Sequence, residues 1–283
     1  MHGQRVATRL GPLRVNVSGE GPTALLWHSL FVDSTTWSRV EQRLATQRRL
    51  LLVDGPAHGT NTPPVRRYTL EDCHGVAADI LDHFHVDEPV DWLGNAWGGH
   101  VGIQFAHTHP ARIRSLIAVG APIPALSPAD RRRTRLLAFL YRVVGARPLA
   151  ALLTDVLLGP DARRSDPTGA RIVADAFRRA NRRGMHAAIA SLSLARPDLA
   201  PVLSAIATPV LITTGRDDPM WTAAEAQAAT EDLPHAATVI LPGAGHVGPL
   251  LQAPEALIDL VTAFWRNPAQ TVASHKAEAG VNS

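Results

Sequence analysis

The sequence has 283 residues, of which 46% are hydrophobic and 19% charged, and its formal net charge is +3. This length is enough to bury a large core, and the composition is that of an ordinary globular protein. The apolar runs are no longer than strands, which excludes a transmembrane helix, and the polar amino terminus lacks the apolar stretch of a signal peptide. The single Cys73 excludes an internal disulfide and fits a reducing compartment. We therefore expect a cytoplasmic protein.

Strand-like and helical segments alternate along most of the chain. The expected strands cover residues 13–19, 23–29, 48–56, 88–95, 113–122, 208–215 and 237–243. The expected helices cover residues 69–84, 97–110 and 222–234. The first of these helices opens with Thr69 and Asp72 at the spacing of a capping box. The later strands are apolar with little alternation, so we predict an α/β fold with a mostly parallel, doubly wound sheet.

One long segment interrupts this alternation. Residues 122–208 contain no strand pattern, whereas 136–159 and 169–195 have helical patterns. We predict a helical lid, or cap, at 122–208, a core made of 1–121 and 209–266, and a flexible tail at 267–283.

The charge of the chain is concentrated in the predicted lid. Residues 122–208 carry fourteen Arg and six Asp with no Lys or Glu, a net charge of +8, which leaves −5 for the remainder. A basic surface can attract nucleic acid, an acidic membrane or an anionic substrate, and the plain alternative is a set of solvated helices.

The stretch from Gly94 to Gly99, GNAWGG, follows an expected strand and opens an expected helix. This spacing of glycines is typical of a nucleophile elbow, a sharp turn that presents an attacking side chain. The residue at the attacking position is Ala96. Further along the chain, Asp218 follows the next-to-last strand and His246 follows the last strand.

These motifs, in this order over residues 23–266, resemble the α/β-hydrolase fold family, and the helical insertion matches its lid. The resemblance implies that residue 96 is the nucleophile position, that His246 is the general base and that Asp218 orients its imidazole. It also implies an oxyanion hole formed by the backbone N–H groups of Leu30 and Trp97. The substrate-binding residues expected around this centre are His28, Ser29, Asn95 and Met220.

Ala96 departs from the family pattern, because a methyl group cannot attack a carbonyl carbon. Related dehalogenases and epoxide hydrolases share Trp97 but need Asp at position 96, so their chemistry is excluded. The local patterns GNxxGG and HSLFVD are similar to those of hydrolases of carbon–carbon bonds in ring-cleavage products and of enol-lactone hydrolases.

Three hypotheses follow for the alanine. It can be an engineered replacement of a serine in an ester, lactone or carbon–carbon bond hydrolase. It can be natural, with the His246–Asp218 dyad as a noncovalent acid/base catalyst. The chain can also be a ligand-binding protein on the hydrolase scaffold, since a fold does not fix a function.

We expect the substrate to be a small or mid-sized, largely apolar carbonyl compound. An anionic substrate is an alternative, and a clamp of lid arginines at 178, 179, 182 and 183 would favour it. The histidine pairs at 83/85 and 107/109 have no third ligand nearby in the sequence, so we predict no metal. The GAGHVG stretch at 243–248 matches a dinucleotide fingerprint only by chance, because Pro249 follows it, and no cofactor is expected. We expect no nucleic-acid partner and no membrane partner, and a homodimer is left open.

Overall fold

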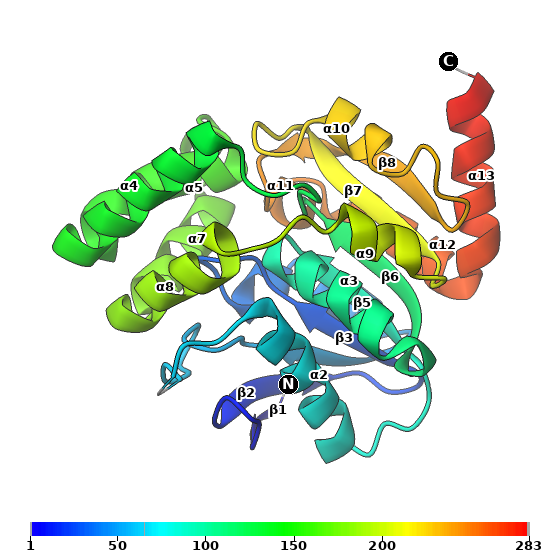
Figure 1. Ribbon diagram of the computed structural model, residues 1–283, viewed down its shortest axis with the longest axis horizontal. Coiled ribbons are helices and arrows are strands. Elements are labelled where there is room, and N and C mark those ends of the chain that lie inside the picture. The colour runs from blue at the N-terminus through cyan, green and yellow to red at the C-terminus, as the bar shows by residue number, and fades with distance from the viewer. Residues whose placement is uncertain (1, 65, 282–283) are drawn as a thin grey trace.

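The computed structural model describes residues 2–64 and 66–281 and is built around an eight-stranded sheet (Figure 1). The strands are β1 (His2–Val6), β2 (Leu13–Ser18), β3 (Thr23–Trp27), β4 (Arg49–Val53), β5 (Val90–Asn95), β6 (Ile113–Val119), β7 (Val210–Asp217) and β8 (Ala236–Ala244). Their order in the sheet is β1-β2-β4-β3-β5-β6-β7-β8. Only the pairs β1–β2 and β2–β4 are antiparallel among these strands, so the predicted mostly parallel α/β sheet is confirmed.

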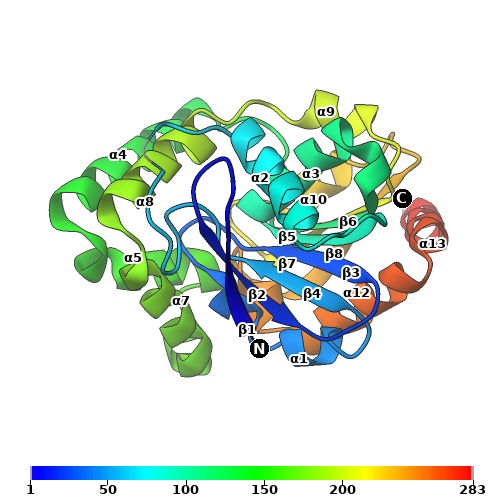
Figure 2. The same cartoon turned by 90° about the horizontal axis from the view of Figure 1, so that it is seen from below.

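Helices cover both faces of the sheet (Figures 1 and 2). One face carries α2 (Leu70–His83), α3 (Trp97–Thr108) and α9 (Ala200–Ala205), and the other carries α1 (Glu41–Leu44) and α12 (Pro254–Arg266). Because both faces are covered, all six residues of the central strand β5 are buried. The remaining short elements of the core are η1 (Ser34–Trp37), η2 (Pro110–Arg112), α10 (Ala223–Ala228) and α11 (Gly248–Leu251).

One local prediction from the sequence is confirmed, and one strand was not predicted. The capping box at the start of α2 is present, with the Asp72 carboxylate accepting from the Thr69 N–H at 2.8 Å. The strand β1 has no counterpart among the expected strands. It is an edge strand that pairs only with β2, and most of its described side chains are exposed, so its sequence lacks an apolar pattern.

The helical insertion between β6 and β7 lies beyond the end of the sheet (Figure 1). It consists of α4 (Pro128–Val144), α5 (Ala146–Leu158), α6 (Ala162–Ser165), α7 (Pro167–Arg179), α8 (Arg182–Ala188) and the π-helical segment η3 (Ile189–Leu194). We call residues 128–194 the lid. The helix expected at 136–159 is broken at Gly145, which has a positive φ of 79°.

The predicted lid range of 122–208 ends too late. The last helix of that range, α9, packs on α3 and belongs to the layer that covers the sheet. Leu203 of α9 is buried there, which returns the chain to the core before β7 begins.

The predicted flexible tail at 267–283 is wrong for its described part, because residues 268–281 form the helix α13 (Pro268–Val281). Asn267 precedes Pro268, and its side-chain oxygen accepts from the Gln270 N–H at 3.4 Å, an arrangement typical of a helix start. Val272 is buried, and Lys276 Nζ donates to the carbonyl oxygens of Thr230 and Glu231 at 3.1 and 3.0 Å. The segment consists mostly of small residues without apolar periodicity, so its sequence did not predict a helix. One buried valine and one lysine contribute to its attachment.

Candidate active site

The turn between β5 and α3 has the backbone of a nucleophile elbow. Ala96 stands between the two elements with φ 46° and ψ −104°, a region that alanine rarely adopts. The flanking glycines are required by packing. A Cβ on Gly98 would lie 2.0 Å from the Trp27 carbonyl oxygen, and one on Gly94 would lie 2.3 Å from the backbone of Gly98. The strain at Ala96 is therefore built into the turn, although no nucleophile is present there.

The residues predicted as base and orienting acid are hydrogen bonded to each other. Asp218 follows β7, His246 follows β8, and His246 Nδ1 donates to Asp218 Oδ2 at 2.5 Å. Both side chains are buried. The Met220 N–H donates to the other carboxylate oxygen of Asp218 at 2.9 Å and fixes its orientation. Within the described chain, His246 Nε2 has no hydrogen-bond partner, so this nitrogen is available to a ligand.

Asn95 connects the elbow to the histidine loop. Its side-chain amide donates to the backbone carbonyl oxygens of His246 at 2.7 Å and Val119 at 3.0 Å. Asn95 is fully buried, and both hydrogens of its amide are used. The geometry therefore gives Asn95 a positioning role, and its expected contact with substrate stays a prediction.

Two backbone N–H groups are free at the predicted oxyanion hole. Neither the Leu30 N–H nor the Trp97 N–H donates a hydrogen bond to any residue that the structure describes, although both residues are buried. Trp97 is the first residue of α3, where N–H groups have no partner inside the helix and the helix dipole favours negative charge. Phe31, next to Leu30, has a positive φ of 76°, which marks a sharp turn in the loop after β3.

The side chains of His28 and Ser29 face the protein. His28 is completely buried, with Nε2 accepting from the Gly55 N–H at 2.9 Å and Nδ1 donating to the Ser29 carbonyl oxygen at 2.7 Å. Burial lowers the pKa of His28, which favours the neutral ring. The Ser29 hydroxyl donates to the Leu30 carbonyl oxygen at 3.2 Å. Both residues thus shape the loop that carries Leu30, and their expected contact with substrate stays a prediction.

The side chains of Trp97, expected at the oxyanion hole through its backbone, and of Met220, expected to bind substrate, lie in different surroundings. The indole of Trp97 packs edge-on against Trp27 and His28, with ring centroids 5.4 Å away in each case, so it lies in the core behind the turn. The Met220 side chain is largely exposed, and the structure gives this residue a role only through its backbone bond to Asp218.

Two ion pairs that the sequence did not reveal attach the lid to the loop after Leu30. Arg179 of α7 forms a bidentate ion pair with the buried Asp33 in the loop that follows Leu30, at 2.8–3.1 Å. Arg39 forms a second bidentate pair, at 2.7 Å, with Asp166 at the start of α7. The two ends of α7 are therefore fastened to the segment 33–39. No short-range pattern could reveal these pairs, because their partners lie more than a hundred residues apart.

Three of the four lid arginines considered as a clamp for a substrate carboxylate are bonded to the protein itself. Arg178 pairs with Asp175 at 3.0 Å, Arg179 is held by Asp33, and Arg182 donates to the Arg142 carbonyl oxygen. These guanidinium groups are occupied by the protein itself.

A buried arginine holds the two connections of the lid together. Arg196, after η3, donates to the carbonyl oxygens of Ile123 at 3.1 Å and Pro124 at 2.5 Å, just after β6. Burial lowers its pKa to about 10. His100 of α3 bonds the neighbouring Pro122 carbonyl oxygen at 3.0 Å through Nε2. His100 thus supports the start of the lid connection.

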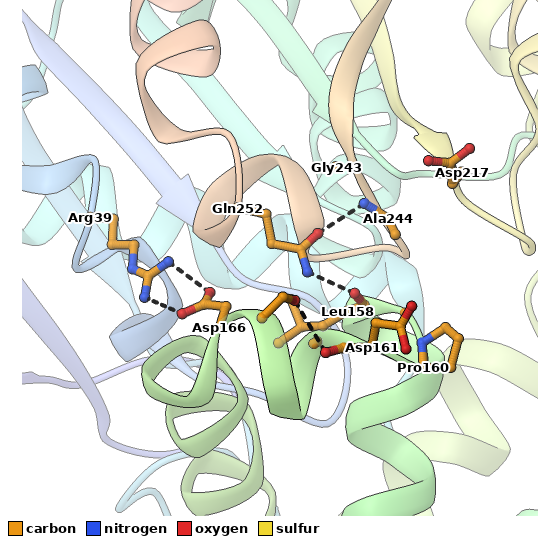
Figure 3. A pocket seen from close by; sticks show the side chains of 12 residues that line it. Arg39, Leu158, Pro160, Asp161, Asp166, Asp217, Gly243, Ala244 and Gln252 are labelled. Carbon is orange, nitrogen blue, oxygen red and sulfur yellow. Dashed lines mark hydrogen bonds and ion pairs between the residues drawn. The ribbon is translucent and has the colours of Figure 1, made fainter.

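A cavity of about 700 Å³ lies between the end of α5, α6 and the turn after β8 (Figure 3). The side chain of Gln252 bridges two of its walls, because it accepts from the Ala244 N–H at 2.9 Å and donates to the Leu158 carbonyl oxygen at 2.8 Å (Figure 3). Neither Ala96 nor the His246–Asp218 pair lines this cavity. The Gln252 bridge fastens the lid to the loop that carries His246.

In residues 2–64 and 66–281, no three His, Cys, Asp or Glu side chains are grouped so that they could hold a metal ion. No described helix is both long enough and apolar enough to cross a membrane.

Comparison with known proteins decides the family. The family model of the alpha/beta hydrolase fold matches residues 22–253. The chain belongs to the α/β-hydrolase fold family. The free backbone donors, the dyad and the elbow occupy the places in the chain order that this family uses for catalysis.

Two curated relatives of this α/β-hydrolase are named as enzymes. The chain is 28% identical to a 2-hydroxy-6-oxononadienedioate/2-hydroxy-6-oxononatrienedioate hydrolase of Cupriavidus pinatubonensis over 215 residues, which is 73% of this chain and 74% of the relative. It is 27% identical to a pimeloyl-[acyl-carrier protein] methyl ester esterase of Nitrosomonas europaea over 264 residues, 90% of this chain and 100% of the relative. Among solved structures, the enol-lactonase of Burkholderia xenovorans shares the fold with a TM-score of 0.85 at 22% identity, covering 93% of this chain and 100% of the lactonase.

Proposed function

We propose that this α/β-hydrolase cleaves small or mid-sized, largely apolar esters or lactones by direct attack of water, with no covalent intermediate. The observation that carries the proposal is the 2.5 Å His246–Asp218 hydrogen bond beside an elbow whose apex is Ala96. A general base with its orienting carboxylate is present, while the side chain that such a base would activate is a methyl group. Water is the nucleophile that remains for it.

The reaction would take place in two steps. In the first, His246 Nε2 accepts a proton from a water molecule while the water oxygen adds to the carbonyl carbon. The carbonyl oxygen becomes an oxyanion, which the N–H groups of Leu30 and Trp97 would stabilise. In the second, the bond to the leaving oxygen breaks and the His246 imidazolium returns its proton to that oxygen. The products are an acid and an alcohol, or one hydroxy acid from a lactone.

Asp218 would stabilise the imidazolium between these steps. Its carboxylate accepts from Nδ1, which fixes the tautomer that leaves the Nε2 lone pair free to take a proton. Asn95 holds the His246 backbone at a fixed place relative to the elbow.

The apolar character of the substrate is supported by the surface that meets the oxyanion loop. Phe31, next to Leu30, packs edge-on against Phe177 of the lid, with ring centroids 5.9 Å apart. Tyr141 of α4 packs on Phe177 at 5.2 Å. Aromatic residues therefore line the contact between lid and loop. The printed names of the relatives and structural neighbours, which include an ester hydrolase and a lactonase, support the same substrate class.

The test is hydrolysis of para-nitrophenyl butyrate and of dihydrocoumarin by the chain as it is and by two dyad variants. His246→Gln and Asp218→Asn are expected to lower kcat at least about a hundredfold, because base catalysis contributes about 10²–10⁴. The control His107→Gln, an exposed histidine at the end of α3, is expected to keep full activity.

The covalent step is tested separately. Pre-steady-state traces should show no burst of released phenol, and intact mass should show no adduct after treatment with a fluorophosphonate. Hydrolysis that is unaffected by His246→Gln, or a stoichiometric adduct, would exclude this mechanism.

A further inference from the structure

The outer face of the lid carries nearly all the large apolar side chains that the described surface exposes. These are Leu136, Phe139, Val143 and Val144 of α4 and Leu152 and Val156 of α5, with Met220 the one outside the lid. Phe139 is 63% exposed, Leu136 58% and Val143 57%. A spacing of three and four residues places these three on one side of α4. An exposed apolar patch of this kind marks an interaction site.

The helix α4 is attached to the protein by a small part of its surface. Of its seventeen residues, only Ala138 and Tyr141 are buried. The helix is about 25 Å long at 1.5 Å per residue. Figures 1 and 2 both show it at the edge of the molecule, at the end opposite α13. Its apolar side chains are thus presented outward along a long, accessible helix.

Arginines flank this apolar stripe. Residues 131–154 contain six Arg and no Lys, Asp or Glu. Arg132, Arg135, Arg142 and Arg147 are exposed and form no ion pair with any described residue. The face therefore combines exposed apolar side chains with about four unneutralised positive charges, and it complements a surface that is anionic outside and apolar beneath.

We propose that α4 and the start of α5 dock this protein on the surface of an anionic phospholipid membrane. A basic amphipathic helix lies in the plane of such an interface, with its apolar side chains among the acyl chains. Arginine side chains reach the phosphate groups while their stems cover apolar surface. This would be peripheral binding without a membrane-spanning segment, and it replaces the expectation of no membrane partner.

The composition of the face distinguishes a membrane from other occupants. A second copy would bring the same patch against itself in a twofold contact, which would place arginines against arginines. A protein interface carries about one hydrogen bond per 100–200 Å². Apart from arginines, residues 131–154 offer only Thr134, Tyr141 and Thr154 as polar side chains, and the last two are buried. Lipid phosphates need only the guanidinium groups.

The experiment is flotation of the full chain with vesicles of phosphatidylcholine alone and of equal parts phosphatidylcholine and phosphatidylglycerol. We expect binding to the anionic vesicles only, and a decrease as salt is added. The double variant Leu136→Ser/Phe139→Ser should lower partitioning at least about tenfold. Neutralising Arg132→Gln and Arg135→Gln should lower it about fivefold for each charge. The control Arg5→Gln, an exposed arginine on β1, should bind like the parent.

A second measurement does not depend on the loss of binding. A Phe139→Trp variant should show additional quenching by lipids that carry bromine on the acyl chain, compared with the parent protein. The proposal is overturned by equal binding to both vesicle types, by absence of binding, or by binding that survives both sets of substitutions. It is also overturned if the protein binds polyglutamate or forms dimers through this face while ignoring the vesicles. All these readouts are binding measurements, so they are independent of the proposed hydrolysis.

Discussion

At the scale of single residues, Ala96 separates the geometry of the site from its chemistry. The elbow keeps the strained backbone angles that present a nucleophile, with φ 46°, and Gly98 allows the close approach of Trp27. Such strain costs of order 1–3 kcal/mol and persists only where the surrounding structure enforces it. The buried Asn95 provides part of this enforcement through its bonds to Val119 and His246.

Restoring a hydroxyl at this position tests whether the centre is organised for covalent catalysis. We expect Ala96→Ser to react stoichiometrically with a fluorophosphonate and to raise esterase kcat at least about a hundredfold, because a triad acts as a unit and the loss of one member costs several orders of magnitude. Intact mass and initial rates give the two readouts. The control Ala96→Ser/His246→Gln should lose both gains. A folded Ala96→Ser protein that stays unreactive would show that the dyad is not aligned with residue 96.

At the scale of elements, the helix α13 is attached to the core without an apolar stripe of its own. Its amino acids are mostly small or polar, it packs on α12, β7 and β8, and its anchors include the buried Val272 and the bonds of Lys276 to carbonyl oxygens of the segment 230–236. The Lys276 ammonium group donates to backbone carbonyl oxygens near a turn. The composition of the helix does not reveal these acceptors.

Truncation of the buried Val272 should therefore lower the stability of the whole domain. Val272→Ala is expected to lower the free energy of unfolding by about 1–2 kcal/mol, since each buried methylene contributes about 0.8 kcal/mol. Urea denaturation followed by circular dichroism measures this. Ser274→Ala, at an exposed position of the same helix, is the control and should cause no loss. Equal stability of both variants would mean that α13 is detached in solution.

At the scale of the whole molecule, the lid is fastened to the core by arginines and polar bridges. Arg179–Asp33 and Arg39–Asp166 hold the two ends of α7, Arg196 joins the entry and exit of the lid, and Gln252 ties α5 to the His246 loop. The helix α4 buries only two side chains and, among the described residues, has no ion pair of this kind with the core. Opening of the lid should thus involve α4, while α5 and α7 stay in place.

The ion pair of Arg179 should contribute to stability in a pH-dependent way. Arg179→Gln is expected to cost about 1–3 kcal/mol, because it leaves the buried Asp33 carboxylate without its charged donor. Hydrogen bonds from Thr35 and the nearby Arg179 lower the pKa of Asp33 below its ordinary 3.8, against the effect of burial. This contribution is therefore complete above that pH and is lost as the pH falls below it.

The difference in unfolding free energy between the parent and Arg179→Gln should accordingly shrink in urea titrations as the pH is lowered from neutral to about 3. Arg178→Gln is the matched control, since its pair with Asp175 is half-exposed and surface pairs contribute at most about 1 kcal/mol. An equal cost for both variants, or a cost independent of pH, would contradict a stabilising role of the Arg179–Asp33 pair.

The sequence by itself determined the sheet and a helical insertion, and it predicted the three positions of the candidate site, because these depend on local patterns. Apolar strands between helices, glycines at a fixed spacing, and Asp218 and His246 after the last two strands are all readable within short windows. The tertiary structure decided the rest. It gave Asn95, His28 and Ser29 hydrogen bonds that support the backbone, it ordered α13, and it placed Asp33, Arg39 and Gln252 against the lid. Each of these outcomes depends on which buried donor meets which distant acceptor, and that pairing exists only after the chain has folded.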